Sequence, residues 1–471
     1  MVTKTRTRTG PGNSGPVEAG PTDPAWAWAP YVPDAGRPWT PRLACHLFRR
    51  ATFGGSIRQI QQALTDGGPG PSIDRLVRPG AAGEAFDRTY DGYEQHAIDP
   101  GSVSVEVLRE WWLRRMMQSP HPLLEVMTLF WHDHFAVSNS RVKSGWLMAQ
   151  HVRRLRAGAL GRLEPLYSSL LRDPALLLSY EAAASRKAVP EQALARAWLE
   201  RFTIGPNQAS DRDIRETARA FTGRFVLRNQ YRELAYEHDG GRKTVLGAEG
   251  NWSDGDVVRI TAARPETARH ISRRVYRWFV SEASEPSDAL LAPLADRLAA
   301  DGDIGRLVET ILRSNLFFST TAYRSKIKSP VALAIGITRL CDGVVPTTQL
   351  GNDLADLGQN LGQPPSSHGW PGGTSWINRA TAIGRTNLAA ALLAGEGPYA
   401  GKLDFQAVDR FHGQPPRDAG RNLVQLLLDD ELPENVRRLV LAPMTASKGD
   451  PERGRRGVAH LIAALPEFQL A

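Results

Sequence analysis

The segment from Leu123 to Phe135 constrains the fold most, because this apolar run carries two histidines and an aspartate near its end. His132, Asp133 and His134 stand between aromatic side chains there. The length and apolar character of the run favour a helix. Burying polar groups without partners is energetically costly. The fold must therefore give this helix hydrogen-bond partners, a ligand or an opening to water.

The chain of 471 residues contains 41% hydrophobic and 23% charged residues, enough apolar surface for a core without disulfides. Residues 1–40 are rich in Thr, Gly and Pro and lack periodicity, so we predict a disordered N-terminal arm. Trp26 and Trp28 are the side chains that could pin its end to the domain. For residues 41–471 we predict a single large helical domain.

Helical periodicity with start and stop signals recurs along the chain. Ser56 and Gln59 form one predicted capping box. Further helices are predicted near residues 104–118, 122–136, 145–157, 163–172, 190–202, 210–221, 265–280, 287–299, 303–316, 330–341, 347–361, 377–394, 422–429, 434–441 and 451–465.

The pattern changes between residues 224 and 261. Asp239-Gly240-Gly241-Arg242 stands between short mixed segments there and is typical of a hairpin turn that needs positive φ angles. The predicted fold class is therefore mainly α, a large multi-helix domain with a small β-hairpin insertion.

Charge and cysteine content narrow the class of protein. Cys45 and Cys341 are the only cysteines and stand far apart in the sequence, which favours free thiols in a reducing compartment. The N-terminus lacks the apolar core of a secretory signal, and no stretch is an uninterrupted membrane span. The net charge is +8 and the pI about 9.6, yet no nucleic-acid-binding signature is present. We expect a cytoplasmic protein with an acidic ligand or partner, and neither nucleic acid nor membrane.

A set of motifs in fixed order resembles the bacterial domain-of-unknown-function family 1800. The motifs are Arg50-Ala51-Thr52-Phe53-Gly54, Phe130-Trp131-His132-Asp133-His134-Phe135, Arg219-Ala220-Phe221-Thr222-Gly223, His238-Asp239, Lys243-Thr244-Val245-Leu246-Gly247, Thr267-Ala268-Arg269, Lys328-Ser329-Pro330, Gly369-Trp370-Pro371-Gly372-Gly373 and Pro466-Glu467-Phe468-Gln469-Leu470. The resemblance extends from about Arg42 to the end of the chain.

The resemblance implies a mostly helical bacterial protein without a settled activity, often encoded beside a sulfatase-like family. Members usually look exported, and this sequence does not. Where the family typically reads Pro-Asn-Glu-Asn-Tyr-Ala-Arg-Glu, this chain has Pro190-Glu191-Gln192-Ala193-Leu194-Ala195-Arg196-Ala197. A His-Pro pair of the family appears as Arg264-Pro265, and a Lys before Gly-Trp as His368. Lys187 and Arg196 match the family pattern.

His132 and His134 invite a metal-binding interpretation that helix geometry opposes. Residues two apart on a helix point about 200° apart, so both imidazoles cannot face one ion unless the helix ends there. The simpler interpretation is that they satisfy buried backbone carbonyls or carboxylates. We expect one histidine to anchor the helix in the core, and only the other, if either, to face a cleft shared with His238.

The predicted hairpin carries a second candidate group. His238 could act as a general base or metal ligand with Asp239 orienting it, whereas Asp before Gly-Gly is also a common turn former. Lys243 could contact an anionic ligand, although Gly241-Arg242-Lys243-Thr244 lacks the glycine spacing of a phosphate-binding loop.

Two more regions supply candidate ligand-binding residues. Lys187 and Arg196 place positive charge around the helix that begins near Pro190, and Arg196 could clamp a carboxylate, phosphate or sulfate or simply pair with Glu200. Trp370 lies on a Gly-rich loop, where it could form an aromatic wall for a sugar or plug the loop onto the core.

Two hypotheses follow. In the first, a ligand-handling enzyme with hydrolytic or metal-assisted chemistry uses His132, His134, His238 and Asp239 as catalytic residues, with Lys187, Arg196, Lys243 and Trp370 binding an anionic or sugar-like ligand and a divalent metal as an open option. In the second, the protein is a non-catalytic scaffold or partner subunit of a sulfatase-like protein.

Overall fold

The computed structural model describes residues 23–78, 80, 83–90, 104–394, 397–404, 408, 419–447 and 450–471. The protein is mainly α-helical and carries two small antiparallel sheets, which confirms the predicted fold class. Across the described ranges, no helix has the length and apolar character needed to cross a membrane.

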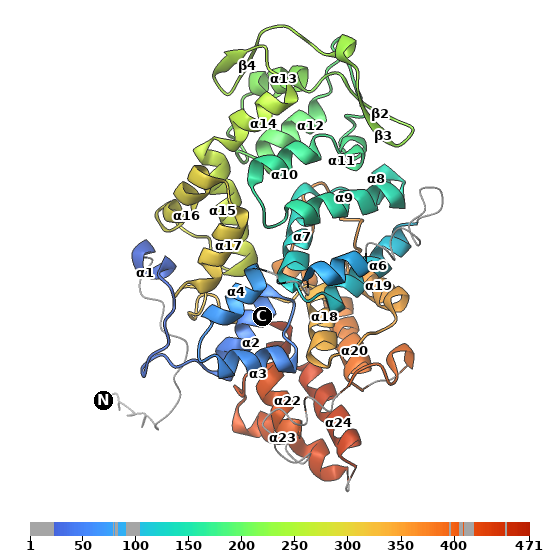
Figure 1. Cartoon of the computed structure of the whole chain (residues 1–471). Coiled ribbons are helices and arrows are strands. Elements are labelled where there is room, and N and C mark those ends of the chain that lie inside the picture. Colours follow the sequence, from blue (N-terminus) through green and yellow to red (C-terminus); the bar gives the residue numbers. More distant parts are fainter. Residues whose placement is uncertain are drawn as a thin grey trace, which may run out of the picture.

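Helices dominate the first half of the chain, joined mostly by short turns (Figure 1). They are α1 (Pro24–Trp28), α2 (Pro41–Ala51), α3 (Ile57–Thr65), α4 (Gly70–Val77), α6 (Val105–Gln118), α7 (Pro122–Phe135), α8 (Asn139–Val142), α9 (Gly145–Gly158), α10 (Leu163–Leu170), α11 (Pro174–Ser179), α12 (Gln192–Ala197), the π-helix η1 (Trp198–Phe202), and α13 (Asp211–Ala220).

The second half is also helical after a short β-containing region. Its helices are α14 (Asp254–Ala262), α15 (Pro265–Phe279), α16 (Asp288–Asp301), α17 (Ile304–Arg313), α18 (Pro330–Leu340), α19 (Thr347–Asp356), α20 (Arg379–Ala394), α22 (Ala419–Leu428), α23 (Glu434–Ala446) and α24 (Pro451–Ala464), with 3-10 turns η2 (Ala235–Glu237), η3 (Gly373–Trp376), η4 (Gly397–Tyr399) and η6 (Pro466–Gln469).

Local sequence signals explain where many of these helices begin. The predicted capping box of Ser56 and Gln59 is present at α3, and Ser210 and Asp213 form another at α13. In each box the serine oxygen accepts from a first-turn N–H, and the third residue accepts from the cap N–H. These caps define the ends of helices whose packing then follows from their apolar stripes.

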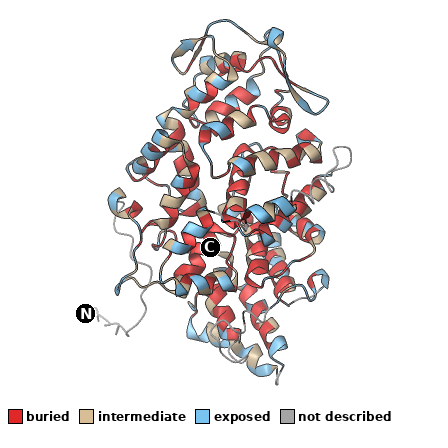
Figure 2. Ribbon diagram, in the orientation of Figure 1, coloured by how far each residue is buried: buried red, intermediate tan, exposed pale blue. Residues whose placement is uncertain are grey.

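The helix α7 lies in the middle of the fold. All of its residues except Leu124 are buried (Figure 2). The helix packs against α2, α4, α6, α9 and η1. A helix that is apolar on every side is stable in water only when other elements surround it. It ends at Ala136, which adopts a left-handed conformation with φ of 49°.

The β-containing region holds two hairpins. β2 (Arg224–Leu227) and β3 (Gln230–Glu233) pair antiparallel, with β1 (Ala184–Ser185) on the other edge of β2, while β4 (Lys243–Val245) pairs with β5 (Ala248–Gly250). Positive φ angles at Arg228 and Asn229, and at Leu246 and Gly247, allow the two tight turns.

The predicted hairpin turn at residues 239–242 is wrong. This segment connects β3 and η2 to β4 and is not itself a hairpin turn. Asp239 accepts a hydrogen bond from the backbone N–H of Gly241 at 2.8 Å and pairs with Arg219 at 2.7 Å. The aspartate therefore shapes a local turn through its own carboxylate, which does not require the positive φ angles that we expected.

The predicted arm also needs correction over its described part. Residues 1–22 lie outside the described residues, but residues 23–40 pack on the helical body. Trp28 is buried in α1, and its indole N–H donates to the carbonyl of Leu290 at 2.6 Å. Pro30 forms an isolated β-bridge with Ser314. The burial of the Trp28 ring, with its N–H hydrogen-bonded, holds this segment on the domain although its composition is typical of a loop.

Candidate functional site

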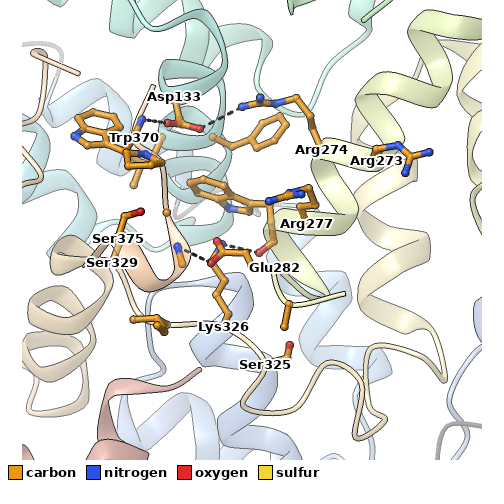
Figure 3. Close-up of a pocket in the computed structure, with 18 of the residues that line it drawn as sticks. Asp133, Arg273, Arg274, Arg277, Glu282, Ser325, Lys326, Ser329, Trp370 and Ser375 are labelled. Carbon is orange, nitrogen blue, oxygen red and sulfur yellow. Dashed lines mark hydrogen bonds and ion pairs between the residues drawn. The ribbon is translucent and has the colours of Figure 1, made fainter. Parts of the chain in front are cut away.

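A cleft of about 1200 Å³ lies among α7, α15 and the Gly-rich loop of residues 368–376 (Figure 3). The end of α2, residues 204–208, the turn after α15, residues 324–332 and the last residues of the chain complete its walls. The cleft thus joins segments that are far apart in the sequence.

Several motifs that carry the family resemblance meet at this cleft. The lining residues that they contribute are Arg50, Phe53, Phe130, Asp133, Arg269, Lys328, Ser329, Trp370, Pro371, Gly372, Gly373 and Leu470. The motifs at residues 219–223, 238–239 and 243–247 instead contact one another near α13 and β4. The motifs therefore form two separate groups in space.

Positive charge predominates in the cleft lining. The basic side chains are Arg49, Arg50, Arg269, Arg273, Arg274, Arg277, Arg324, Lys326 and Lys328, and the acidic ones are Asp133, Glu266, Glu282 and Asp288. Low-dielectric walls around a concave site strengthen the field of such an excess. The cleft is therefore attractive to anions.

The helical repeat of α15 places its apolar residues on one face and its arginines on another. Ile271, Val275 and Phe279 are buried in the core, whereas arginines at positions 269, 273 and 277 follow at intervals of one turn on another face. These arginines form surface pairs, of which Arg273 with Asp288 at 2.6 Å is one. Such exposed pairs contribute little to stability and can exchange partners.

Arg50 is the basic residue in the lining with the least complete set of partners. It is only 5% exposed, and its Nη2 donates to the carbonyl of Val280 at 3.1 Å, to the carbonyl of Ala322 and to Ser325 Oγ at 2.8 Å. Its Nε and Nη1 are buried without a partner among the described residues, no described carboxylate forms an ion pair with it, and Glu282 acts on its charge only at longer range. A buried guanidinium in this state favours an anion beside it.

Lys328 resembles Arg50 in this respect. Its Nζ donates to the carbonyl of Phe468 at 2.6 Å and lies 4.3 Å from the centroid of that ring. Burial lowers the pKa of Lys328 well below its usual value. No described carboxylate forms an ion pair with its amino group, and Asp429 acts on it electrostatically only at longer range.

Asp133 is the residue of the His-Asp-His motif that faces the cleft. Its Oδ1 accepts from the backbone N–H of Trp370 at 2.7 Å, and its Oδ2 pairs with Arg274 at 3.2 Å (Figure 3). Burial raises the pKa of Asp133, and Arg274 partly offsets this effect. The carboxylate thus links α7, α15 and the Gly-rich loop.

Glu282 makes an equivalent link at the other end of the loop. Its Oε2 accepts from the backbone N–H of Gly373 at 3.0 Å, and its Oε1 pairs with Lys326 at 3.0 Å. Lys326 Nζ also lies 4.3 Å from the centroid of the Trp278 ring. Burial lowers the pKa of Lys326, and Glu282 partly opposes that shift.

Both histidines of the motif are buried away from the cleft lining. His134 contacts the carbonyl of Phe202 through Nε2 at 3.3 Å, and burial lowers its pKa well below the usual value. His132 packs edge-on against Trp112, and burial lowers its pKa to about 3. Both histidines are therefore buried in the core, as we expected of at least one of them, and neither lines the cleft with His238. Successive residues of a helix are 100° apart, so the side that lies between the histidines belongs to Asp133.

His238, Asp239 and Lys243 lie beside α13 and β4, outside the cleft lining. His238 Nδ1 is 3.1 Å from the carbonyl of Thr222. Hydrogen bonding to Arg219 lowers the pKa of Asp239. Lys243 is buried, and its Nζ donates to the carbonyl oxygens of Asp239 and Gly241 and to the side chain of Asn251. These contacts fix the local backbone, and the proposed catalytic and ligand-binding roles stay predictions.

The remaining predicted ligand-binding residues differ in position. Lys187 is exposed, and Arg196 forms exposed pairs with Glu200 at 3.1 Å and Asp211 at 3.3 Å, so neither lies in the cleft lining. Trp370 does line the cleft but is only 7% exposed. Its burial favours the interpretation that the indole fastens the loop to the core.

Sequence reasoning missed Arg50, Arg274, Glu282, Lys326 and Lys328 as members of one site. Arg50 and Lys328 belong to motifs that were already identified, and the spacing of the arginines on α15 was a readable signal. The described residues contain no group of three or more His, Cys, Asp or Glu side chains arranged to hold a metal ion.

Comparison with protein families gives one result. The family model described as "Protein of unknown function (DUF1800)" matches residues 46–470, nearly the whole chain. The chain therefore belongs to this family, as its motifs indicated. Searches of curated proteins and of solved structures return no match.

Proposed function

We propose that this member of the DUF1800 family binds a small anionic ligand in the cleft between α7, α15 and the Gly-rich loop. The observation that carries the proposal is Arg50, a buried guanidinium in the cleft wall with two nitrogen atoms unpartnered among the described residues. A ligand oxyanion beside it would supply both a counter-charge and hydrogen-bond acceptors.

The surroundings of Arg50 support the same conclusion. Lys326 and Lys328 line the same region of the cleft, and only Glu282 forms a described ion pair with either of them. The hydroxyl groups of Ser325 and Ser329 add polar contacts. A carboxylate, sulfate or phosphate group fits this combination of basic and hydroxyl groups.

Binding is the part of the function that the geometry supports best. The hydrolytic or metal-assisted chemistry considered from the sequence required His132, His134, His238 and Asp239 in one cleft, and these residues are distributed over three environments. A reaction in this cleft could use the acidic side chains of the lining, among which Asp133 and Glu282 also bond to the Gly-rich loop.

The test is calorimetric titration of the purified protein with sodium sulfate, sodium phosphate and sodium citrate at constant ionic strength, with glucose as the neutral comparison. Arg50→Met should weaken binding by roughly 10- to 100-fold, the loss expected for one charged hydrogen bond. Arg297→Met is the matched control, because Arg297 is an exposed arginine on the neighbouring α16 and, among the described residues, bonds to Thr310 alone.

The result expected is saturable binding of at least one anion that Arg297→Met retains. Equal affinity in Arg50→Met and wild type, or no binding of any of the three anions, contradicts the proposal. Because Arg50 also holds two backbone carbonyls, Arg50→Lys is a second variant that keeps the charge. It should bind more tightly than Arg50→Met.

A partner role beside a sulfatase-like protein stays a prediction from the family resemblance. Co-purification from the native host tests it, since recovery of the protein alone counts against a stable complex.

A further inference from the structure

Residues 369–373 of the Gly-rich loop are fastened to the cleft at two points. At each point one carboxylate accepts from a loop N–H and also pairs with a cleft cation (Figure 3). Asp133 joins the loop to Arg274, and Glu282 joins it to Lys326. The same two carboxylates therefore hold the loop in position and neutralise the side chains of Arg274 and Lys326.

At Gly369 the loop approaches Asp133 too closely for any residue but glycine, whereas at Gly372 the positive φ angle alone favours glycine. Gly369 has φ of +76°, and a Cβ atom there would lie 2.2 Å from Asp133 Oδ1. Gly372 also has a positive φ, and its Cβ would be 3.6 Å from Glu282 Oε1. The backbone conformation that these glycines allow brings the N–H groups of Trp370 and Gly373 onto the carboxylates.

The carboxylates are of the same chemical class as the expected ligand. Arg274 and Lys326 both line the cleft, so a bound oxyanion and the protein's own acids compete for the same cations. A carboxylate that loses its cation to a ligand is left partly buried next to a second negative charge. Like-charge repulsion then favours its movement away from the ligand, together with the loop N–H that it holds.

We propose that Asp133 and Glu282 act as internal competitors, which keep the loop of residues 369–373 against the cleft until an anionic ligand takes over Arg274 and Lys326. This inference rests on the proposed anion binding and adds its regulation. It assigns to Asp133 and Glu282 the role of positioning the loop and setting the ligand affinity.

The first test is sulfate titration of Asp133→Asn and Glu282→Gln. Each variant removes one negative charge, keeps the size of the side chain and leaves an amide oxygen to accept from the loop N–H. Removal of one opposing charge a few ångströms from the ligand should tighten sulfate binding by roughly tenfold in each variant. Asp301→Asn is the matched control, because Asp301 pairs with Arg306 outside the cleft lining, and it should bind like wild type.

The second test is hydrogen exchange of the Trp370 and Gly373 amides in the wild-type protein with and without sulfate. Faster exchange with sulfate is expected, because the ligand releases the loop. Unchanged or weaker sulfate binding in both Asp133→Asn and Glu282→Gln, or slower exchange of both amides with sulfate, overturns the inference while leaving anion binding intact. Failure of wild type and all variants to bind sulfate, phosphate or citrate overturns the proposed function, and this inference with it.

Discussion

Replacing His132 with phenylalanine should make the protein less sensitive to acid. His132 is fully buried, and burial lowers its pKa to about 3. In the unfolded chain the same side chain has a pKa near 6.5. As the pH falls, the unfolded state therefore takes up a proton that the folded state does not, and the free energy of unfolding decreases. A phenylalanine at this position cannot take up a proton in the unfolded state, and it keeps an aromatic ring against Trp112.

The magnitude follows from the two pKa values. Between about pH 6.5 and about pH 4.5, selective protonation of the unfolded state lowers the free energy of unfolding by about 2 kcal/mol for one such histidine. Other histidines with lowered pKa values, His134 and His270 among them, add to the acid sensitivity of both proteins. The difference between wild type and His132→Phe isolates the contribution of His132.

Urea unfolding followed by tryptophan fluorescence at several pH values measures this difference. A constant offset in stability between the two proteins does not matter, because the readout is the change with pH. His460→Gln is the control, because it removes an exposed histidine instead of a buried one. A pH dependence that is the same in His132→Phe and wild type would refute the reasoning and show that His132 takes up its proton in the folded state.

Three further predictions concern single positions. Gly369→Ala should destabilise the protein by more than about 1 kcal/mol in urea unfolding, because of its positive φ and the contact with Asp133; wild-type stability would contradict the assigned close packing. Ser329→Ala should cost about 1 kcal/mol in the same assay, because Ser329 caps α18; no loss would mean that water replaces the cap. Arg196→Ala should change stability by less than about 0.5 kcal/mol and leave sulfate affinity as in wild type, since its pairs are exposed; weaker sulfate binding would place the ligand near α12.

Much of the helical fold was predictable because its determinants are local. Ser56 and Gln59, three positions apart, indicate the start of α3. The apolar run that ends at Phe135 is enough to predict a central helix. The sequence predicted one hairpin in the region that contains the two observed hairpins, but it placed the turn at residues 239–242, where neither hairpin turns. There, the side chain of Asp239 and its partner Arg219, which is distant in sequence, decide the backbone path.

The candidate site was predictable only in part, because its residues come from separate segments. Helical geometry predicted that His132 and His134 point to different sides of α7, but it could not say which side of α7 faces the cleft. That side is occupied by Asp133, whose partner Arg274 is 141 residues further along the chain. The clustering of Arg50 with Lys326 depends on packing that no local pattern encodes.

Crystals of the protein soaked with selenate test the central claim most directly, because selenium can be located by its anomalous scattering. We predict a selenate ion inside the cleft with an oxygen about 3 Å from Arg50 Nε or Nη1, and its absence in crystals of Arg50→Met. Selenate bound only outside the cleft, or occupying the same place in Arg50→Met, would contradict the account.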